Sequence, residues 1–500
     1  MKRQNRHTFL SSLLFSIIVI LYLFISLPAS AQMQFEWVRN YPNFQGHSAA
    51  IDSSGNIYSV GDSSSYLIVL KHNPNGNLLW KRKLNYIKSN SPILVATDKN
   101  KDIYVSCSNI AHDYVLTKID SFGQLKWENV LDYGGWDEPY SIAIDTIGYV
   151  YITGSTFNGI TKCLTVKYTP QGDTLWTRIN PDYIMSGKYI SLDDSGYVYV
   201  AGYYTVPGVG DYFGTLKYNN NGNLKWFSKY RYQNKDSFGL CVKSDNKGNC
   251  FVSGWIYNNV NHISGLIKYD YKGDSIWVRT FADSSMPNLG TNMILDENGN
   301  IYLSSYFTLK YDTTGVLLWY KNNNDYNLYS FAYKNNSLYC AGWGPNNFLI
   351  NELDTKGKLI SQKYYPQTSF SHELMCFNNS VYLLTDAQDS LILIKFRTSP
   401  NSVANNANIF INYNLHQNFP NPFNSSTTIK YSLSANGIIT LKVYDIKGKE
   451  ITTLVNNSKT AGEYAERLTT DNFNLPTGVY FYSLYINNTL KKKKKLVVIK

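Results

Sequence analysis

The sequence predicts an all-β protein in which a repetitive, multi-bladed β-propeller is followed by a small Ig-like β-sandwich. Three observations favour this fold class. A unit of about 45 residues recurs along most of the chain. Turn sequences recur at fixed places inside each unit, and a different set of short alternating strands fills the C-terminal end. The composition agrees, because 15% of the residues are aromatic and aromatic side chains pack well on a pleated sheet.

Each repeat contains two turn modules. The first is an Asp-x-x-Gly turn followed by an apolar strand, as in residues 52–58, and it returns at 145–151, 193–199, 245–251 and 296–302, with a degraded copy at 98–104. The second ends in tryptophan, and its copies end at Trp80, Trp127, Trp176, Trp226, Trp277 and Trp319. Successive tryptophans are 47, 49, 50, 51 and 42 residues apart. Repeats of this length form propellers or solenoids.

Every repeat divides into four short strands, two around each turn. Asp and Gly suit such turns, because Asp caps the backbone and Gly supplies a positive φ. The last repeat stops after a third strand at residues 391–396, whereas residues 34–39 look like a fourth strand with no repeat before it. Pairing these two segments would close a ring and remove two open sheet edges. Eight second-strand modules indicate eight blades, with seven as the alternative.

The N-terminus has the three parts of a signal peptide. Basic residues precede an apolar run over residues 9–27, and Ala29-Ser30-Ala31 has the small-residue pattern of a cleavage site. We therefore expect residues 1–31 to be removed, so that Gln32 begins the mature chain. An uncleaved membrane anchor is the alternative.

The positive charge is concentrated at the two ends of the chain. Of the net +11, +3 lies in the signal peptide, and residues 410–500 carry 12 Lys/Arg against 5 Asp/Glu. About +1 remains for residues 32–409. A nucleic-acid-binding protein needs a basic patch on its folded body. The distribution therefore argues against nucleic acid as a partner.

Residues that could act in catalysis or bind a metal are scattered along the chain. The six cysteines contain no C-x-x-C pair, so we expect buried thiols, with a Cys241–Cys250 disulfide across a hairpin as the alternative. The Asp-x-x-Gly turns lack the closing Glu of an EF-hand calcium loop. Histidines occur singly, and no nucleophile-elbow, metalloprotease or phosphate-binding motif is present. We assign no catalytic, cofactor-binding or metal-binding residue and expect no cofactor.

The repeat resembles a known family. The pattern D-x-x-G-N-[IV]-Y-[VI]-[ST]-G, followed by K-Y-[DN]-x-x-G-x-L-x-W, resembles the bacterial SBBP β-propeller repeat over residues 34–397. This resemblance implies a propeller over residues 32–397 and says little about activity. The G-x-L-x-W strand also resembles the tryptophan-docking repeat of quinoprotein dehydrogenases. Those enzymes commonly have adjacent cysteines near their cofactor, which this sequence lacks, and packing between blades would explain the tryptophans without a ligand.

Beyond a polar, Asn-rich linker at residues 398–409, the pattern changes. Short strands separated by Pro and Gly turns fill residues 410–500 and predict a small β-sandwich. Its landmarks are N-F-P-N-P-F-N at 418–424, V-Y-D-x-x-G at 443–448, L-P-T-G-V-Y at 475–480 and a lysine-bearing final strand. Together they resemble the type A sorting domains of type IX secretion.

The resemblance to type A sorting domains implies an export route and a partner. Such domains carry cargo from the periplasm across the outer membrane through the type IX machinery, and the mature protein is released or attached to the surface. The signature positions would act in folding and recognition; they are Pro420, Asn421, Pro422, Phe423, Gly478, Val479 and Tyr480. The run Lys491–Lys495 is expected to be solvated, with an anionic surface as the alternative contact.

Candidate ligand-binding residues lie where the repeats differ from one another. They are Trp136, Asp137, Glu138, Tyr203, Tyr204, Trp255 and Trp343. Aromatic faces beside carboxylates suit sugars or peptides, and plain packing is the alternative. We therefore expect a monomeric, secreted or cell-surface module that binds an extracellular glycan or protein, or serves a structural role, without catalysis. The alternatives are a secreted polysaccharide lyase or hydrolase and, third, a quinoprotein dehydrogenase.

Overall fold

The computed structural model describes residues 33–499 apart from short gaps at 64–65, 85–91, 180–184, 246, 258–261, 283–291, 325, 345–347, 366–370, 388–389, 399–413, 434–436, 460–461, 474 and 487–488. The chain divides into two compact units, Met1–Ser402 and Val403–Lys500. The predicted signal peptide and the predicted linker after residue 398 lie outside the described residues.

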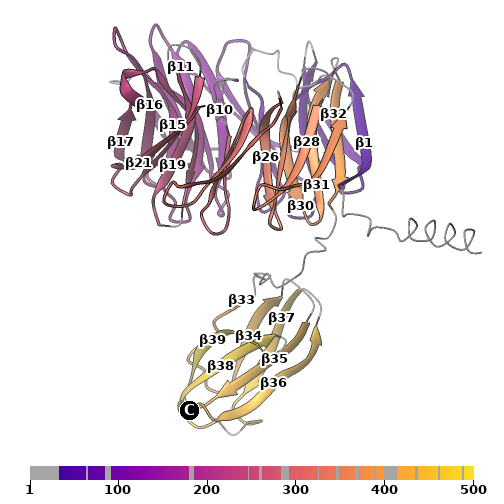
Figure 1. The fold of residues 1–500 in the computed structure, drawn as a ribbon. Helices are drawn as coiled ribbons and strands as arrows, with labels where there is room; N and C mark the ends of the chain where they lie inside the picture. The colour runs from indigo at the N-terminus through magenta and orange to yellow at the C-terminus, as the bar shows by residue number, and fades with distance from the viewer. Residues whose placement is uncertain are drawn as a thin grey trace, which may run out of the picture. The chain divides into compact units, whose positions relative to one another are not determined.

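The described residues of the first unit form eight four-stranded antiparallel sheets (Figure 1). The first two contain β2 (Gln45–Ile51), β3 (Ile57–Ser63), β4 (Tyr66–His72) and β5 (Leu78–Leu84), then β6 (Leu94–Thr97), β7 (Ile103–Ser108), β8 (Tyr114–Ile119) and β9 (Leu125–Leu131). The third and fourth contain β10 (Trp136–Ile144), β11 (Val150–Phe157), β12 (Thr161–Tyr168) and β13 (Thr174–Ile179), then β14 (Met185–Leu192), β15 (Val198–Val206), β16 (Gly210–Tyr218) and β17 (Leu224–Tyr230).

The remaining sheets continue the same order after a 3₁₀ turn, η1 (Tyr232–Asn234). The fifth and sixth contain β18 (Ser237–Ser244), β19 (Cys250–Tyr257), β20 (His262–Tyr269) and β21 (Ser275–Phe281), then β22 (Asn292–Leu295), β23 (Ile301–Ser304), β24 (Phe307–Tyr311) and β25 (Leu317–Asn322). The seventh contains β26 (Asn327–Lys334), β27 (Ser337–Trp343), β28 (Phe348–Asp354) and β29 (Leu359–Tyr365). The eighth contains β30 (Ser371–Phe377), β31 (Ser380–Ala387), β32 (Ser390–Arg397) and β1 (Gln34–Pro42).

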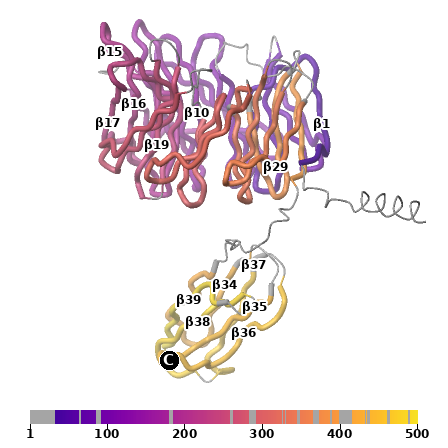
Figure 2. Tube along the Cα trace, in the orientation of Figure 1, coloured from indigo at the N-terminus to yellow at the C-terminus, as the bar shows by residue number. Residues whose placement is uncertain are grey.

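The sheets close into a ring. The first strand of each sheet contacts the first strand of the next, from β2 and β6 through to β26 and β30, and β30 contacts β2 in turn. The first strands are therefore innermost. Indigo β1 lies beside orange β32 and pairs antiparallel with it, with Val38 opposite Ile394 (Figure 1; Figure 2). The N-terminal segment thus supplies the fourth strand that the last repeat lacks, as the sequence predicted.

The Asp-x-x-Gly turns connect the first and second strands of a sheet. In the first repeat, Asp52 Oδ1 accepts the backbone N–H groups of Ser54 and Asn56 at 2.8 and 2.9 Å. Its Oδ2 accepts the Tyr58 hydroxyl at 3.0 Å. The same Asp–Tyr pair recurs at Asp98–Tyr104, Asp145–Tyr151, Asp193–Tyr199 and Asp296–Tyr302. Each Asp thus caps a turn and also satisfies a tyrosine hydroxyl in the core.

The repeated tryptophans join neighbouring sheets. Trp80 Nε1 in β5 donates to the Ser121 carbonyl of the second sheet at 3.1 Å, and Lys71 Nζ donates to the same oxygen at 2.7 Å. Gly123 in that turn has φ +86°, and a Cβ there would lie 3.1 Å from the Trp80 ring. Trp37 of β1 meets Gly76 in the same way across the ring closure. These tryptophans pack between sheets.

The second unit has two sheets around one apolar core. One sheet runs β33 (Asn414–Leu415), β34 (Ser426–Leu433), β37 (Gly462–Thr469), and the other runs β36 (Glu450–Lys459), β35 (Gly437–Tyr444), β38 (Gly478–Ile486), β39 (Thr489–Val498). Ile429 and Leu468 from the first sheet and Leu441 and Leu484 from the second are all buried in this core.

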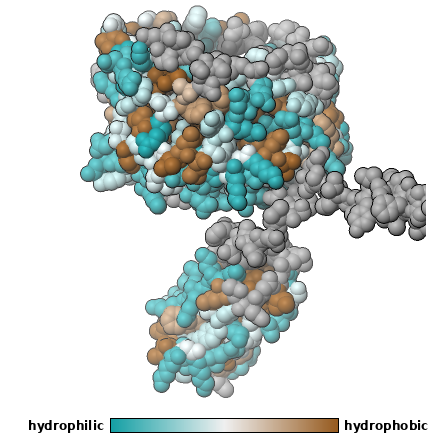
Figure 3. Space-filling view, in the orientation of Figure 1, coloured by the Kyte–Doolittle hydropathy of each residue, from teal (hydrophilic) through white to brown (hydrophobic). Residues whose placement is uncertain are grey.

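The six cysteines are free thiols, and five of them are buried. The alternative disulfide is not formed, because the register of β18 and β19 places Cys241 opposite Ser253 and Cys250 opposite Ser244. Within the described residues, no helix has the length and apolar character needed to cross a bilayer. On the face that Figure 3 draws, apolar residues of the first unit form separate patches among hydrophilic ones.

Candidate functional site

A pocket of about 280 Å³ brings together three of the predicted ligand-binding residues, Trp136, Glu138 and Tyr203. It lies between the third and fourth sheets, and we refer to it as the Trp136 pocket. The residues that line it are Trp136, Glu138, Tyr140, Ser155, Phe157, Thr161, Ser186 and Tyr203.

Strand alternation in β10 sorts its residues between two faces. Trp136, Glu138 and Tyr140 are two residues apart and all line the pocket, whereas Asp137 lies between them in sequence and is fully buried. A bulge between Pro139 and Ser141 interrupts the pairing with β11 at Tyr140. The Tyr140 hydroxyl donates to Glu138 Oε2 at 2.5 Å, which orients that carboxylate.

Aromatic rings form the open side of the pocket. The Trp136 side chain is 58% exposed, and its ring stacks on His112 with centroids 4.8 Å apart and planes at 18°. Phe157 is 45% exposed and lies 6.5 Å from Trp136 between ring centroids. Large apolar rings held open to solvent in this way are available for a ligand.

Lys188 is a residue that the sequence did not single out. It sits in the bulge between Gly187 and Tyr189 of β14, with Nζ 3.4 Å from the Tyr140 ring centroid and 5.4 Å from that of Tyr203. Burial lowers the pKa of Lys188 to about 8, and Glu138 opposes the change. Tyr140 was also missed, although alternation from Trp136 along β10 would have found it. Lys188 required the bulge, which only strand pairing reveals.

Trp255 lies outside the pocket lining but continues its aromatic row. The Tyr203 ring meets Phe238 edge-on at 5.5 Å, and Phe238 stacks on Trp255 with centroids 3.8 Å apart. His262 then meets Trp255 edge-on at 4.5 Å. The row therefore runs from the fourth sheet into the fifth.

Tyr204 and Trp343, both predicted as ligand-binding residues, are not part of this site either. Tyr204 points to the opposite face of β15 from Tyr203 and packs against Tyr212 and Phe227, with centroids 5.9 and 5.4 Å away. Trp343 ends β27 in the seventh sheet and is 38% exposed. For Tyr204, packing is the better interpretation.

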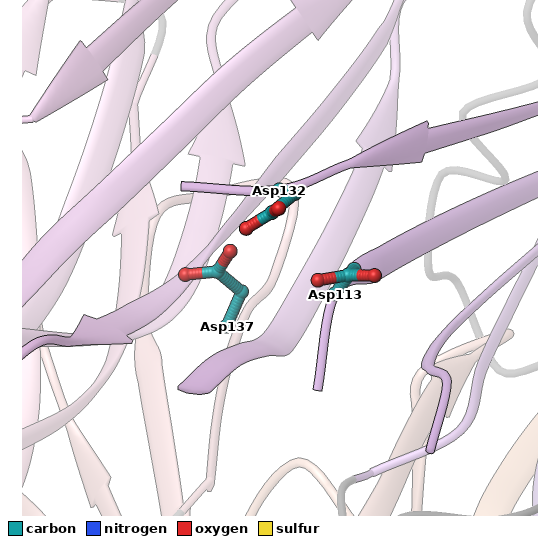
Figure 4. A group of neighbouring side chains, drawn as sticks. All are labelled: Asp113, Asp132 and Asp137. Atoms are coloured by element: carbon teal, nitrogen blue, oxygen red, sulfur yellow. The ribbon is translucent and has the colours of Figure 1, made fainter. Parts of the chain in front are cut away.

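Asp137 belongs to a different group of side chains. Its carboxylate lies close to those of Asp113 and Asp132, and Figure 4 shows the three turned toward one another. One oxygen from each of the three lies within 4.8 Å of the others. Asp137 was predicted from the sequence as a ligand-binding residue, but it does not line the Trp136 pocket.

A second hollow, of about 320 Å³, lies at the turns of the fourth and fifth sheets. Asp193 and Asp245 line it, but each Oδ1 already accepts two backbone N–H groups within its own turn. These two carboxylates are thus occupied in holding the repeat together.

The sorting-signature residues hold the start of the second unit against its last strand. Asn421 Oδ1 accepts the Val497 N–H at 2.8 Å, and buried Phe423 donates its N–H to the Val497 carbonyl at 3.0 Å. The Pro420 carbonyl accepts the Thr427 hydroxyl at 2.7 Å. Pro422 follows a cis peptide bond, as Pro420 does.

The L-P-T-G-V-Y landmark opens β38. Gly478 and Val479 pair with Val498 and Val497 of β39, and the Tyr480 hydroxyl donates to the Pro476 carbonyl at 2.9 Å. Phe419, which immediately precedes Pro420, is 81% exposed. It is the most exposed apolar residue of the signature segment, and its neighbour Asn418 is buried.

The two units resemble different kinds of known protein. Residues 417–500 match the family model described as "Secretion system C-terminal sorting domain". The protein is therefore exported by type IX secretion to the cell surface or the extracellular space. No match to a curated protein was found.

Solved structures resemble the chain in fold. The C-terminal WD40 domain of Sif2 is 11% identical, with a TM-score of 0.50 over 72% of this chain and 98% of that one. The Dos1 propeller is 10% identical, with a TM-score of 0.51 over 72% of this chain and 95% of that one. At these identities the likeness shows a β-propeller fold and nothing about its ligand.

Proposed function

We propose that the protein is a non-catalytic surface module that binds an extracellular carbohydrate in the Trp136 pocket. The single observation that supports this most is the pair of exposed rings, Trp136 and Phe157, beside a carboxylate that Tyr140 orients. Such a site offers apolar area together with a few fixed polar groups, as ligand pockets do.

The polar groups around these rings match a hydroxyl-rich ligand. The Glu138 carboxylate accepts hydrogen bonds, while the Ser155 and Ser186 hydroxyls both donate and accept them. Sugar rings present apolar C–H faces to aromatic rings and hydroxyl groups to this polar rim. A protein ligand is the competing choice, and the same experiment separates the two.

The pocket favours binding over polysaccharide cleavage. Hydrolysis of a glycosidic bond ordinarily uses two carboxyl groups on either side of the bond. Glu138 is the one carboxylate among the described lining residues. Tyr140 does not suit the role of base in an elimination, because burial raises the pKa of its hydroxyl, and its bond to Glu138 raises this pKa further. The Tyr140 hydroxyl therefore stays protonated and acts as a donor.

We further propose the finer assignments that accompany this function. The repeats are of the SBBP type, each sheet is one blade of an eight-bladed propeller, and residues 398–409 are a linker. Residues 1–31 are a cleaved signal peptide. Residues 410–500 are an Ig-like sandwich whose signature positions serve folding and recognition, with exposed Phe419 as the residue most accessible to the secretion machinery. The exported protein is a monomer, released or attached at the outer surface.

A glycan array probed with the full-length secreted protein tests the proposal. Saturable binding to a carbohydrate is expected, and Trp136→Ala should weaken it by about thirtyfold, as loss of a central aromatic contact typically costs about 2 kcal/mol. Trp343→Ala is the matched control, because Trp343 is exposed in another sheet.

Three results would contradict the proposal. The first is no carbohydrate binding by the unaltered protein, and the second is equal affinity of the Trp136→Ala variant and the unaltered protein. The third is release of new polysaccharide ends, which would make the protein an enzyme. Binding to protein ligands alone would replace the carbohydrate assignment with a protein one.

A further inference from the structure

Three aspartates from three different segments of the chain meet between the second and third sheets. Asp113 precedes β8, Asp132 follows β9, and Asp137 lies in β10. Carboxylate oxygens from the three lie within 4.8 Å of one another (Figure 4). Like charges at this spacing repel, so the arrangement needs a compensating positive charge.

No such charge comes from the described part of the protein. None of the three aspartates forms an ion pair with a lysine, arginine or histidine there. Their hydrogen bonds are to neutral groups. Asn109 Nδ2 donates to Asp113 Oδ2 at 2.9 Å, and the Gly134 N–H donates to Asp132 Oδ1 at 2.6 Å. These bonds orient the two carboxylates and leave a further oxygen on each.

Asp137 provides a second, independent observation. Its side chain is fully buried, and Oδ2 accepts the Tyr133 N–H at 2.8 Å. Its Oδ1 is also buried but accepts no hydrogen bond from any described residue. A buried carboxylate oxygen without a partner is unfavourable unless a cation or proton satisfies it. The Thr156 side chain also forms a hydrogen bond to this carboxylate.

We propose that Asp113, Asp132 and Asp137 form a binding site for a divalent cation, with calcium as the ion. All the donors are oxygens, which calcium binds at about 2.3–2.6 Å, so two oxygens on one ion lie up to about 5 Å apart. The aspartates meet that spacing. Calcium accepts irregular arrangements and completes its shell with water or backbone carbonyls. Exposed Asp132 leaves one side of the site open to solvent.

The cation would also fix the edge of the Trp136 pocket. Asp137 follows Trp136 and Asp113 follows His112, the two residues whose rings stack at 4.8 Å. The Asp137 N–H already donates to the His112 carbonyl at 2.7 Å. A calcium ion between the carboxylates would strengthen this join of two sheets. The cation site itself does not depend on what the pocket binds.

This site was not predicted from the sequence, from which no metal-binding residue was expected. Asp113 and Asp132 are 19 residues apart, and Asp137 lies in the first strand of the next repeat. Their spacing follows no calcium-loop pattern. Only the packing of the second sheet against the third brings them together.

Calcium binding by the EDTA-treated full-length protein, measured by titration calorimetry, tests the proposal. One ion should bind, with a dissociation constant of about 10⁻⁴–10⁻³ M, as in extracellular modules. Asp137→Asn should weaken binding at least tenfold. Asp132→Asn should do the same, and this variant keeps an oxygen for the Gly134 N–H at an exposed position, so its folding is safe. Asp173→Asn, an exposed aspartate outside the cluster, should leave binding unchanged.

The proposal is wrong if the unaltered protein binds no calcium, or if both cluster variants bind it as well as the unaltered protein. Equal affinity for magnesium would overturn the choice of calcium. The result is separable from the carbohydrate proposal, because Trp136→Ala should weaken glycan binding while retaining calcium affinity.

Discussion

At the scale of single residues, the glycine in the second turn of a repeat packs against a tryptophan of the preceding sheet. Gly172 has φ +99°, and a Cβ at this position would lie 2.8 Å from the Trp127 ring of the preceding sheet. The Trp127 indole donates to the Pro170 carbonyl in the same turn at 3.1 Å. The turn and the ring thus fit together only with glycine at this position.

Gly172→Ala should therefore be more destabilising than an alanine at another left-handed glycine. Gly159 has φ +79° and nothing within 4 Å of its Cβ position. Gly159→Ala is expected to cost about 1 kcal/mol for the backbone alone, and Gly172→Ala about 2 kcal/mol more for the steric conflict. Thermal unfolding of the two variants measures this. Equal losses would show that the tryptophan does not dock as described.

Residues that recur in the repeat, or that depart from it, could be predicted from the sequence. Residues that are brought together only by packing between strands and sheets could not. The Asp and Gly positions of the turns follow from their recurrence and from turn chemistry. Trp136, Glu138 and Tyr203 stood out because they depart from the repeat. Lys188 and the Asp113–Asp132–Asp137 group gave no such signal, because a bulge and the contact between two sheets place them.

At the scale of elements, the innermost strands interact around the ring axis, including strands of sheets that are not neighbours. Lys243 Nζ of β18 donates to the Tyr189 hydroxyl of β14 at 3.1 Å. Glu373 of β30, on the other side of the ring, interacts electrostatically with Lys243. Burial raises the pKa of Glu373 to about 7, and Lys243 opposes the rise. These side chains therefore face the centre of the ring.

The raised pKa of Glu373 predicts a dependence of stability on pH. In the unfolded chain this carboxyl releases its proton near pH 4.5, whereas in the folded protein it keeps the proton until about pH 7. The folded state binds more protons between these values, so stability should fall as pH rises from about 4.5 to 7. The contribution is on the order of 3 kcal/mol.

Glu373→Gln removes this titration. The difference in melting temperature between the variant and the unaltered protein should rise in favour of the variant as pH increases from 5 to 7.5. If the two melting curves shift in parallel over this range, Glu373 titrates normally and the account of the ring axis is wrong.

The strand order of the ring was predictable from the ends of the repeat. The incomplete last repeat and the unattached segment around Trp37 indicated that β1 joins β32. The register, and the bulges that interrupt β2, β10, β14, β18, β26 and β30, could not be predicted, because they depend on the fit of each strand to its partner.

At the scale of the whole molecule, the two units have separate cores and separate tasks. The second unit contains its own buried cluster, and its signature segment is bonded to its own last strand. The run Lys491–Lys495 lies on β39, an edge strand of its sheet, with most of these lysines exposed. Lysines on an edge strand prevent sheets from pairing edge to edge, which accounts for the run without any anionic partner.

We infer that residues 410–500 direct export of the first unit. The most direct measurement is the location of the protein, by cell fractionation and by protease access at the cell surface, in a host with a working type IX system. The full chain should reach the exterior, and a chain lacking residues 410–500 should remain as a folded propeller in the periplasm. If the truncated chain also reaches the exterior, the C-terminal unit is not the export signal.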